Sequence, residues 1–201
     1  MRRGVGLASL LAIVIALGLA AYVQYGRDSG VQVASVPATA VQAETHYSPD
    51  ENLERLDIET LERAQRSIDV AMFAFTDKYI AERLVELAQR GVRIRIYRDQ
   101  SQYEQEQRNA ARHRDFSTTE MFRGEPNIQV RLKRSGRRNV MHLKAFLVDG
   151  TLLRDGSANW SAAGLKAQDN SAHYTNHPAL VEAFQRKFDE MWEDRDNVEI
   201  Q

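Results

Sequence analysis

The stretch 67–96 constrains the fold most, because it carries the pattern of a strand, a helix and a second strand. Residues 67–75 (SIDVAMFAF) are largely apolar and few, which is typical of a buried strand. Over 78–90 apolar residues recur at helical spacing, and Gly91 follows where a helix commonly ends. Residues 92–96 alternate apolar side chains with arginine, as a half-exposed strand does. This order favours two parallel strands joined by a right-handed crossover.

The rest of the chain after residue 50 alternates in the same way between helix-like and strand-like segments. The stretch 101–120 is the exception, because it is polar and charged without a persistent apolar stripe. A mobile loop and a solvated helix are both compatible with it. The interleaved order predicts the α/β class, with a mixed, largely parallel β-sheet flanked by helices on both faces. The further predicted elements are helices at about 51–65 and 179–192 and strands at 128–132, 142–148 and 151–154.

The N-terminal residues differ sharply from the rest in composition. Arg2 and Arg3 precede an uncharged apolar run of 20 residues, 4–23. A helix of that length spans the ~30 Å hydrocarbon core of a bilayer, and the basic flank should stay in the cytoplasm. We therefore expect an exported protein, periplasmic or secreted. Residues 1–25 are interpreted as a cleaved signal peptide or an uncleaved inner-membrane anchor, 26–46 as a flexible linker, and 47–201 as the folded domain.

Composition removes several classes of site. The chain has no cysteine, which excludes disulfides, thiolate metal sites and a cysteine nucleophile. The histidines and carboxylates show no metal-ligand spacing, so no metal ion or other cofactor is expected. The formal net charge is −1, so only a local concentration of charge can argue for a nucleic-acid partner.

The segment 142–159, HLKAFLVDGTLLRDGSAN, gathers groups that suit one kind of chemistry. His142 and Lys144 lie two residues apart on a predicted strand, so both side chains should emerge on one face, with Leu143 turned toward the core. A turn and a short return strand would bring Ser157 and Asn159 back beside them. An imidazole can attack phosphorus as a nucleophile, and fixed cationic and neutral donors stabilise the charge on the phosphoryl oxygens.

The spacing His142, Lys144, Asp149, Gly156, Ser157, Asn159 fits the signature H-x-K-x4-D-x6-G-S-x-N without departure. The chance of six fixed positions matching somewhere in such a chain is on the order of a few in a million. The chain therefore resembles the phospholipase D superfamily. Between residues 47 and 192 it is similar to the small bacterial endonucleases of that family and to its mitochondrial single-motif member, which carries an N-terminal anchor. The segments TDKYIAERLVELAQRGVRIRIYRDQ, NWSAAG and FQRKFDEMW also carry this resemblance.

The resemblance implies a role for each motif residue. His142 would be the nucleophile or, in a partner copy, the acid that protonates the leaving oxygen. Lys144 and Asn159 would hold the phosphate oxygens, and Ser157 would position the phosphate or the histidine. Asp149 belongs to the signature but would support the local fold away from the phosphorus.

The family also carries a downstream carboxylate, usually glutamate, that orients the histidine. The nearest candidate here is Asp169, followed by Asn170. Its side chain is shorter, and the loop from Asn159 is one residue shorter as well. Asp169 is therefore included in the expected catalytic set as a departure from the family pattern.

One copy of the motif supplies half of a two-histidine site. Of the five histidines, only His142 lies in an H-x-K pattern. The reaction needs one histidine as nucleophile and another as acid and base. We therefore expect a homodimer with the active site at its two-fold interface.

The basic run just before the motif favours nucleic acid as the substrate, although the motif itself fits phospholipids equally well. Such a cluster suits a polyanionic backbone, and Arg93, Arg95 and Arg98 are expected to extend it. A solvated loop balanced by acidic residues is the alternative interpretation. A phospholipase held near a membrane and a non-catalytic nucleic-acid-binding member of the fold are the competing functions. The expected substrate-binding residues are Arg131, Lys133, Arg134, Arg137 and Arg138.

Overall fold

A computed structural model describes residues 41–115, 117–134, 136 and 139–200. Contacts divide the chain into two units, Met1–Thr39 and Ala40–Gln201. The predicted signal peptide or anchor lies outside the described residues, as does most of the predicted linker. Within the described ranges no helix is both long and apolar enough to cross a membrane.

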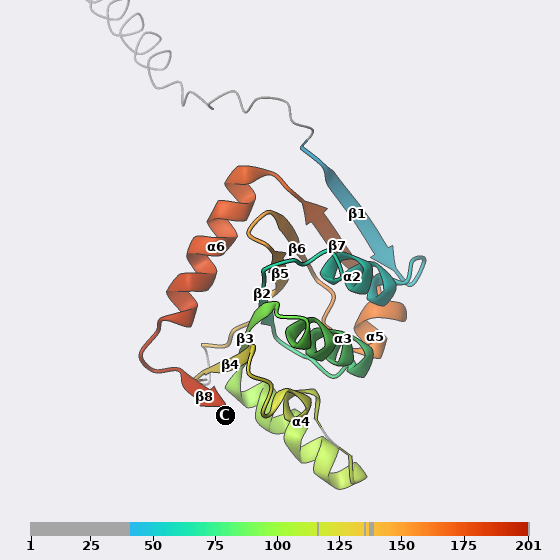
Figure 1. Cartoon of the computed structure of the whole chain (residues 1–201). Helices are drawn as coiled ribbons and strands as arrows, with labels where there is room; N and C mark the ends of the chain where they lie inside the picture. The colour runs from blue at the N-terminus through green and yellow to red at the C-terminus, as the bar shows by residue number, and fades with distance from the viewer. Residues whose placement is uncertain (1–40, 116, 135, 137–138, 201) are drawn as a thin grey trace, which may run out of the picture. The chain divides into compact units, whose positions relative to one another are not determined.

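The folded unit is built on one mixed sheet of eight strands in the order β1-β7-β6-β5-β2-β3-β4-β8 (Figure 1). Strands β2, β3 and β4 form the parallel part of the sheet, and the strands that follow β4 in the sequence lie on both sides of it. The strands are β1 (Ala43–Ser48), β2 (Ser67–Met72), β3 (Arg93–Asp99), β4 (Ile128–Lys133), β5 (Lys144–Val148), β6 (Leu152–Gly156), β7 (Asn170–Thr175) and β8 (Val198–Ile200).

Helices cover both faces of the sheet, as expected, because the central strands are apolar on both sides. On β2, Val70 joins the larger core under α2 and α3, whereas Ala71 faces the other way and joins the cluster under α6. Figure 1 shows α6 on one side of the sheet and the group of α2, α3 and α5 on the other. The helices are α2 (Leu53–Leu61), α3 (Lys78–Gln89), α4 (Gln100–His113), α5 (Ala162–Lys166) and α6 (Pro178–Trp192), with a 3-10 turn, η1 (Thr118–Phe122).

The predicted crossover is confirmed, but the prediction of a largely parallel sheet is wrong. Strands β2, β3 and β4 pair in parallel through the α3 and α4 connections. The other pairings between described strands are antiparallel. A tight turn after β5 forces β6 to run back beside it, because two residues or so can join antiparallel neighbours but never parallel ones.

Two elements, β1 and α4, differ from expectation because neither has a pattern of apolar residues that would reveal it in the sequence. Strand β1 begins at Ala43, inside the predicted linker, and pairs with β7 along its length although most of its side chains are exposed. Helix α4 occupies most of the stretch 101–120, for which both a mobile loop and a solvated helix were compatible with the sequence. Its one buried residue is Glu106, a charged side chain that hydrophobic periodicity cannot detect.

Candidate active site

His142 and Lys144 lie together at the start of β5, on the same side of the chain as the sequence predicts. The Lys144 Nζ is 3.2 Å from Nδ1 and 3.3 Å from Nε2 of His142, and it donates to the His142 carbonyl oxygen at 2.8 Å. Two nearly equal distances are not the geometry of a hydrogen bond along one ring lone pair. The carbonyl therefore holds the ammonium beside an imidazole whose nitrogens remain available.

The two side chains differ in exposure. His142 is exposed, whereas Lys144 is 8% exposed, and this burial lowers the pKa of its ammonium. Strand β5 begins only at Lys144, so His142 lies in the segment before the strand rather than within it. Leu143 is 39% exposed, which corrects the expectation that it anchors the strand in the core.

The Phe73 side chain lines one side of the site. From the sequence, Phe73 was expected only as part of the strand 67–75. Its ring centroid lies 4.6 Å from that of His142, and the Lys144 Nζ sits 5.1 Å from the same ring. Its N–H donates to the Leu143 carbonyl at 3.0 Å, which extends the pairing of β2 with β5 past the strand ends. The antiparallel register that brings Phe73 to His142 is a tertiary feature, so no local pattern could have identified it.

The side-chain amide of Asn159 is oriented by a hydrogen bond to the backbone of Ala74. Its Oδ1 accepts the N–H of Ala74 at 3.2 Å, which leaves Nδ2 as the end available to donate to a phosphate oxygen. Lys144 thus offers an ammonium over the Phe73 ring, and Asn159 offers an amide N–H beside Ala74, the next residue of the connector that follows β2.

Ser157 is tied to β7. Its hydroxyl donates to Asn170 Oδ1 at 2.9 Å and accepts the N–H of Ser171 at 2.9 Å. Asn170 in turn donates through Nδ2 to the Gly164 carbonyl. Asn170 is therefore the polar residue that the fold brings to the motif, although in the sequence it is distinguished only as the neighbour of Asp169.

Asp169 itself is exposed, and its side chain makes no hydrogen bond or ion pair within the described part of the chain. The structure places Asp169 just before β7, next to the Asn170 that contacts Ser157. The shorter loop after Asn159 thus places an amide, rather than the expected carboxylate, against the motif.

Asp149 lies at the opposite end of β5 from His142. Its carboxylate accepts the backbone N–H groups of Gln65, Arg66 and Ser67 at 2.8–2.9 Å. Partial burial acts to raise the pKa of Asp149, but these three bonds outweigh it and hold the pKa below its usual range. The residue closes the turn before β2 and is not positioned to meet a phosphate at His142.

The buried ion pair of Arg154 and Asp57 contacts the backbone at two places in the motif, Lys144 and Ala158. Arg154 and Asp57 are fully buried, with Arg154 Nε 3.0 Å from Asp57 Oδ1. Arg154 also donates to the carbonyls of Lys144 and Ala158, at 3.0 and 3.3 Å. The Asp57 carboxylate accepts two further donors, Trp160 Nε1 and the Tyr174 hydroxyl, and burial together with Asp57 raises the pKa of that hydroxyl.

The predicted basic residues are only partly gathered at the site. Arg131 is turned toward α6, where it donates to the Trp192 carbonyl and lies over the Trp192 ring. Lys133 is half-buried at the end of β4, and Arg134 is exposed just beyond it. Arg137 and Arg138 lie outside the described residues.

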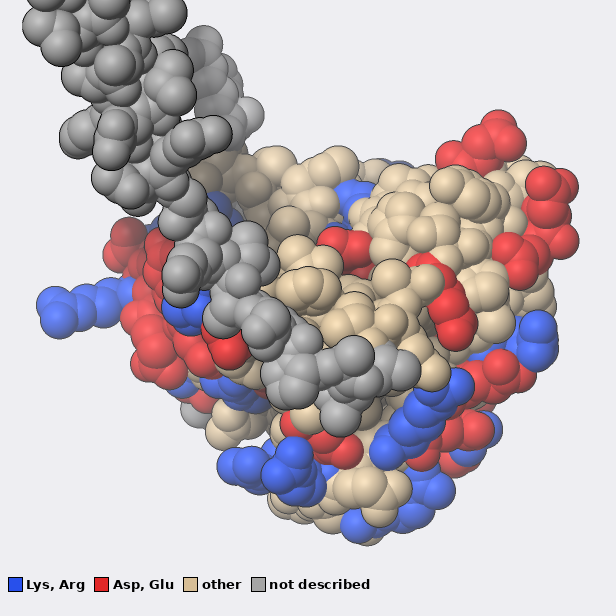
Figure 2. Space-filling view, turned by 90° about the horizontal axis from the view of Figure 1, so that it is seen from above, with Lys and Arg blue, Asp and Glu red and all other residues tan. Residues whose placement is uncertain are grey.

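The expected extension of this cluster along β3 is wrong for Arg95 and Arg98, while Arg93 is exposed at the opposite end of β3 from Asp99. Arg98 is fully buried in an ion pair with Glu106, and Arg95 is bound to Asp69 and Asp189. The face in Figure 2 shows acidic and basic side chains interspersed, so the parts of it left visible carry no broad field of one sign. Any case for a polyanionic substrate therefore depends on the segment from 133 to 138.

No group of three histidine or carboxylate side chains in the described ranges is arranged to hold a metal ion. The donors of this region are the Lys144 ammonium beside His142 and the Asn159 amide, which is held by Ala74, the residue after Phe73. The chemistry that they offer is nucleophilic attack by an imidazole on a phosphorus whose oxygens are held by N–H donors.

Comparison with known proteins identifies the family of the chain. A family model described as "Cardiolipin synthase, PLD-like domain" matches residues 58–192. The mitochondrial cardiolipin hydrolase of Chlamydomonas reinhardtii is 31% identical over 136 residues, which is 68% of this chain and 56% of that protein. The human protein of the same name is 27% identical over 167 residues, 83% of this chain and 60% of its own length. The chain thus spans less than two thirds of these relatives.

Solved structures share the fold. Nuc from Salmonella typhimurium, a phospholipase D family member, superposes with a TM-score of 0.65 at 21% identity, covering 80% of this chain and 99% of Nuc. NucT from Helicobacter pylori gives a TM-score of 0.65 at 22% identity, over 76% of this chain and 96% of NucT. With an intact H-x-K motif, which occurs once in the sequence, and a family model that matches residues 58–192, the chain belongs to the phospholipase D superfamily.

Proposed function

We propose that this protein is a phosphodiesterase, and specifically an endonuclease that cleaves DNA or RNA without a metal ion, through a covalent phosphohistidine on His142. The observation that carries the proposal is the exposed His142 imidazole beside the Lys144 ammonium, with the Asn159 amide held by Ala74. Each of these groups can act on a phosphodiester at once, because the nucleophile and the oxygen-binding donors are already fixed.

The proposed reaction has two steps. In the first, a ring nitrogen of His142 forms a bond to phosphorus while the bond to the leaving ester oxygen breaks. The partner subunit's His142 gives that oxygen its proton. In the second, water attacks the same phosphorus, the partner's His142 takes the water proton, and the nitrogen–phosphorus bond breaks. One water is consumed, and a phosphate monoester and a free hydroxyl are released.

A second copy of the chain is proposed because the other described histidines lie elsewhere in the fold. His46 lies 2.8 Å from Glu51, His173 is bonded to Thr45, and His177 caps α6. His113 is the last residue of α4, at the opposite end of that helix from Asp99, which binds Met141. A two-fold axis beside His142 would supply the second imidazole with no further residue type. The exposed side of His142 leaves room for that approach.

The position of the basic segment 133–138 supports a nucleic-acid substrate. Lys133 pairs in register with Asp99 at the end of β4, and the Asp99 carboxylate binds the N–H of Met141. The segment between them therefore starts and ends at the side of His142. It contains the exposed Arg134, and Arg137 and Arg138 belong to the same segment of the sequence. Cations at such a place suit a repeating phosphate backbone.

A phospholipid is the second candidate substrate, and a different observation favours it. Val140 and Leu143, on either side of the His142 segment, are 44% and 39% exposed. Apolar side chains beside a phosphate site suit acyl chains, and the curated relatives are named for cardiolipin hydrolysis. The apolar run 4–23 would hold the domain near a membrane if it is uncleaved.

One assay separates the two. The wild-type protein and His142→Ala are incubated with labelled DNA, labelled RNA, and vesicles of phosphatidylcholine or cardiolipin, each with and without EDTA. We expect nucleic-acid cleavage that depends on His142 and survives EDTA. Cleavage of vesicles alone would establish the phospholipase instead, and loss of activity in EDTA with recovery on adding a divalent ion would overturn the metal-independent mechanism.

A further inference from the structure

The connector 73–77, between β2 and α3, runs through the site, and its backbone N–H groups are all occupied. Such groups must find acceptors when they leave solvent, so their partners show what holds the segment. The acceptors come from the motif strand, from Asn159, from the residue after Asn159, and from α4. In order, Phe73 donates to the Leu143 carbonyl, Ala74 to Asn159 Oδ1, Phe75 to Glu106 Oε1, and Thr76 and Asp77 to the Trp160 carbonyl.

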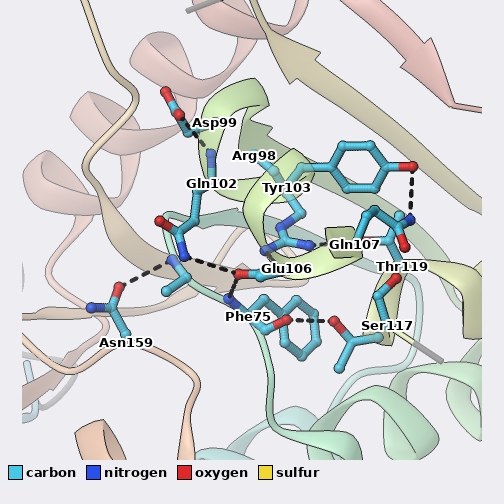
Figure 3. A network of polar contacts seen from close by, with 12 residues as sticks. Phe75, Arg98, Asp99, Gln102, Tyr103, Glu106, Gln107, Ser117, Thr119 and Asn159 are labelled. Carbon is cyan, nitrogen blue, oxygen red and sulfur yellow. Dashed lines mark hydrogen bonds and ion pairs between the residues drawn. The ribbon is translucent and has the colours of Figure 1, made fainter. Parts of the chain in front are cut away.

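Glu106 is the acceptor that lies outside the motif segments. It projects from α4 to the Phe75 N–H at 3.0 Å, while its other oxygen meets Arg98 at 2.5 Å (Figure 3). Both side chains are buried, Glu106 at 5% exposed and Arg98 at 0%. Arg98 is further held by the Thr119 hydroxyl.

Stability alone does not account for this ion pair. Replacing both members of a buried pair with apolar residues of similar volume is often neutral or stabilising. An apolar residue at position 106 cannot, however, accept the Phe75 N–H. What the carboxylate adds to the fold is therefore an acceptor at one chosen point of the connector.

That point lies next to both catalytic groups. Phe75 follows Ala74, which holds the Asn159 amide, and Phe73, whose ring contacts His142 and Lys144. We infer that Glu106 is a positioning residue for the phosphodiester reaction, acting through the Phe75 peptide on Asn159 and on the wall against His142. This inference depends on the proposed function of His142 and Asn159.

The connector has enough other anchors to remain folded without Glu106. The Phe75 ring is fully buried against Trp160 and Phe122, and its carbonyl accepts the Thr118 hydroxyl. Loss of one acceptor should thus loosen the connector rather than unfold the domain. A displacement of about 1 Å in a catalytic group can lower turnover about 100-fold.

The test compares two double variants that differ in one acceptor. Arg98→Met with Glu106→Gln keeps a carbonyl oxygen for the Phe75 N–H, and Arg98→Met with Glu106→Met does not. Both are uncharged at this place, and both lose the Arg98 bond to Thr119. Glu104→Met, on the exposed face of α4, is the control for a change of helix surface.

Turnover is measured on bis(p-nitrophenyl) phosphate, a small phosphodiester that assumes neither nucleic acid nor lipid, together with the melting temperature. We expect kcat of the Met–Gln variant within about 3-fold of wild type, and kcat of the Met–Met variant lower by about 10- to 100-fold with KM changed by less than about 3-fold. Because the Phe75 N–H loses its acceptor, Met–Met should melt at a lower temperature than Met–Gln, so kcat is measured well below both melting transitions. Equal kcat in the two folded variants would overturn the inference.

Hydrogen exchange of the connector distinguishes this inference from the proposed function. If the wild-type protein cleaves no phosphodiester at all, the proposed function fails, and exchange alone then decides the role of Glu106. Faster exchange confined to 73–77 in Met–Met, and absent from Met–Gln and Glu104→Met, would show that Glu106 holds the connector, which is the structural half of the inference. Equal exchange in both double variants would refute it.

Discussion

The Asp99 carboxylate accepts the backbone N–H of Met141 at 3.0 Å, which ties the end of β3 to the residue before His142. The same carboxylate caps α4 by accepting the N–H groups of Ser101 and Gln102. Asp99 is fully buried, so an unpaired N–H left behind by its removal would stay out of water. The place of His142 and the start of α4 therefore depend on one side chain.

Replacing Asp99 with alanine should lower both stability and turnover. Loss of a helix cap costs about 0.5–2 kcal/mol, and the unsatisfied Met141 N–H adds about 1–3 kcal/mol. Urea unfolding and kcat at a temperature well below the transition check this. Asn52→Ala removes a cap from α2 away from the site and should lower stability without lowering kcat. A fall in kcat equal in both variants would contradict the role given to Asp99.

The Arg154–Asp57 pair predicts a large loss of stability when one partner is removed. Both residues are fully buried, so Asp57→Ala leaves an uncompensated guanidinium beneath the motif at a cost of about 3–5 kcal/mol. The exposed pair Arg55–Glu59 is the control, because Glu59→Ala should cost less than about 1 kcal/mol. Chemical denaturation measures both. Similar losses in the two variants would show that burial of the Arg154 pair has no special consequence.

Asp149 predicts a specific acid sensitivity. Its pKa is held below the usual value in the folded protein, so its ionised form stabilises the fold above the pKa of an unfolded aspartate. That contribution is lost as the pH falls through the lowered pKa of the folded state. In Asp149→Asn the stability at neutral pH should be lower, and its decline between about pH 5 and pH 2 should be shallower.

The check is a series of melting temperatures across that range for the wild type and the variant, with kcat at neutral pH measured alongside. Because Asp149 lies at the far end of β5, kcat should change little. Parallel pH curves, or loss of turnover in a variant that remains folded, would contradict a supporting role.

The sequence could predict what local pattern and spacing encode. The crossover through α3 and the meeting of His142 with Lys144 were both predictable, because helical periodicity and a two-residue spacing are local properties. The contacts of Phe73, Asn170 and Glu106 could not be predicted in this way. They depend on strand register and on the place of α4, whose buried side is a carboxylate rather than an apolar stripe.

The errors have the same origin. The prediction of a largely parallel sheet applied the parallel pairing of one β-α-β unit to the later strands as well. Strands β5 and β6 are instead joined by a tight turn and run antiparallel. The expected basic extension treated Arg95 and Arg98 as free cations, although the fold pairs Arg95 with Asp69 on the neighbouring strand and Arg98 with Glu106 on α4. Alternation identifies which residues share a face, but not which charges meet there.

Arg134 predicts how cleavage of nucleic acid depends on salt. If it contacts a phosphate, Arg134→Ala should weaken DNA binding and reduce the slope of log K against log salt by about 0.9. Arg90→Ala, an exposed change at the end of α3 away from His142, is the matched control and should leave the slope unchanged. Binding titrations from low to physiological salt measure the slope. An unchanged slope in Arg134→Ala would exclude this residue from the binding surface.

The most direct measurement is the capture of the covalent intermediate. The wild-type protein is mixed with excess DNA or bis(p-nitrophenyl) phosphate, quenched in alkali, which preserves phosphohistidine, and analysed by peptide mass spectrometry. The mechanism predicts a phosphoryl adduct on the peptide that carries His142, and none in His142→Ala. Turnover without any adduct on His142, or an adduct on another residue, would contradict it.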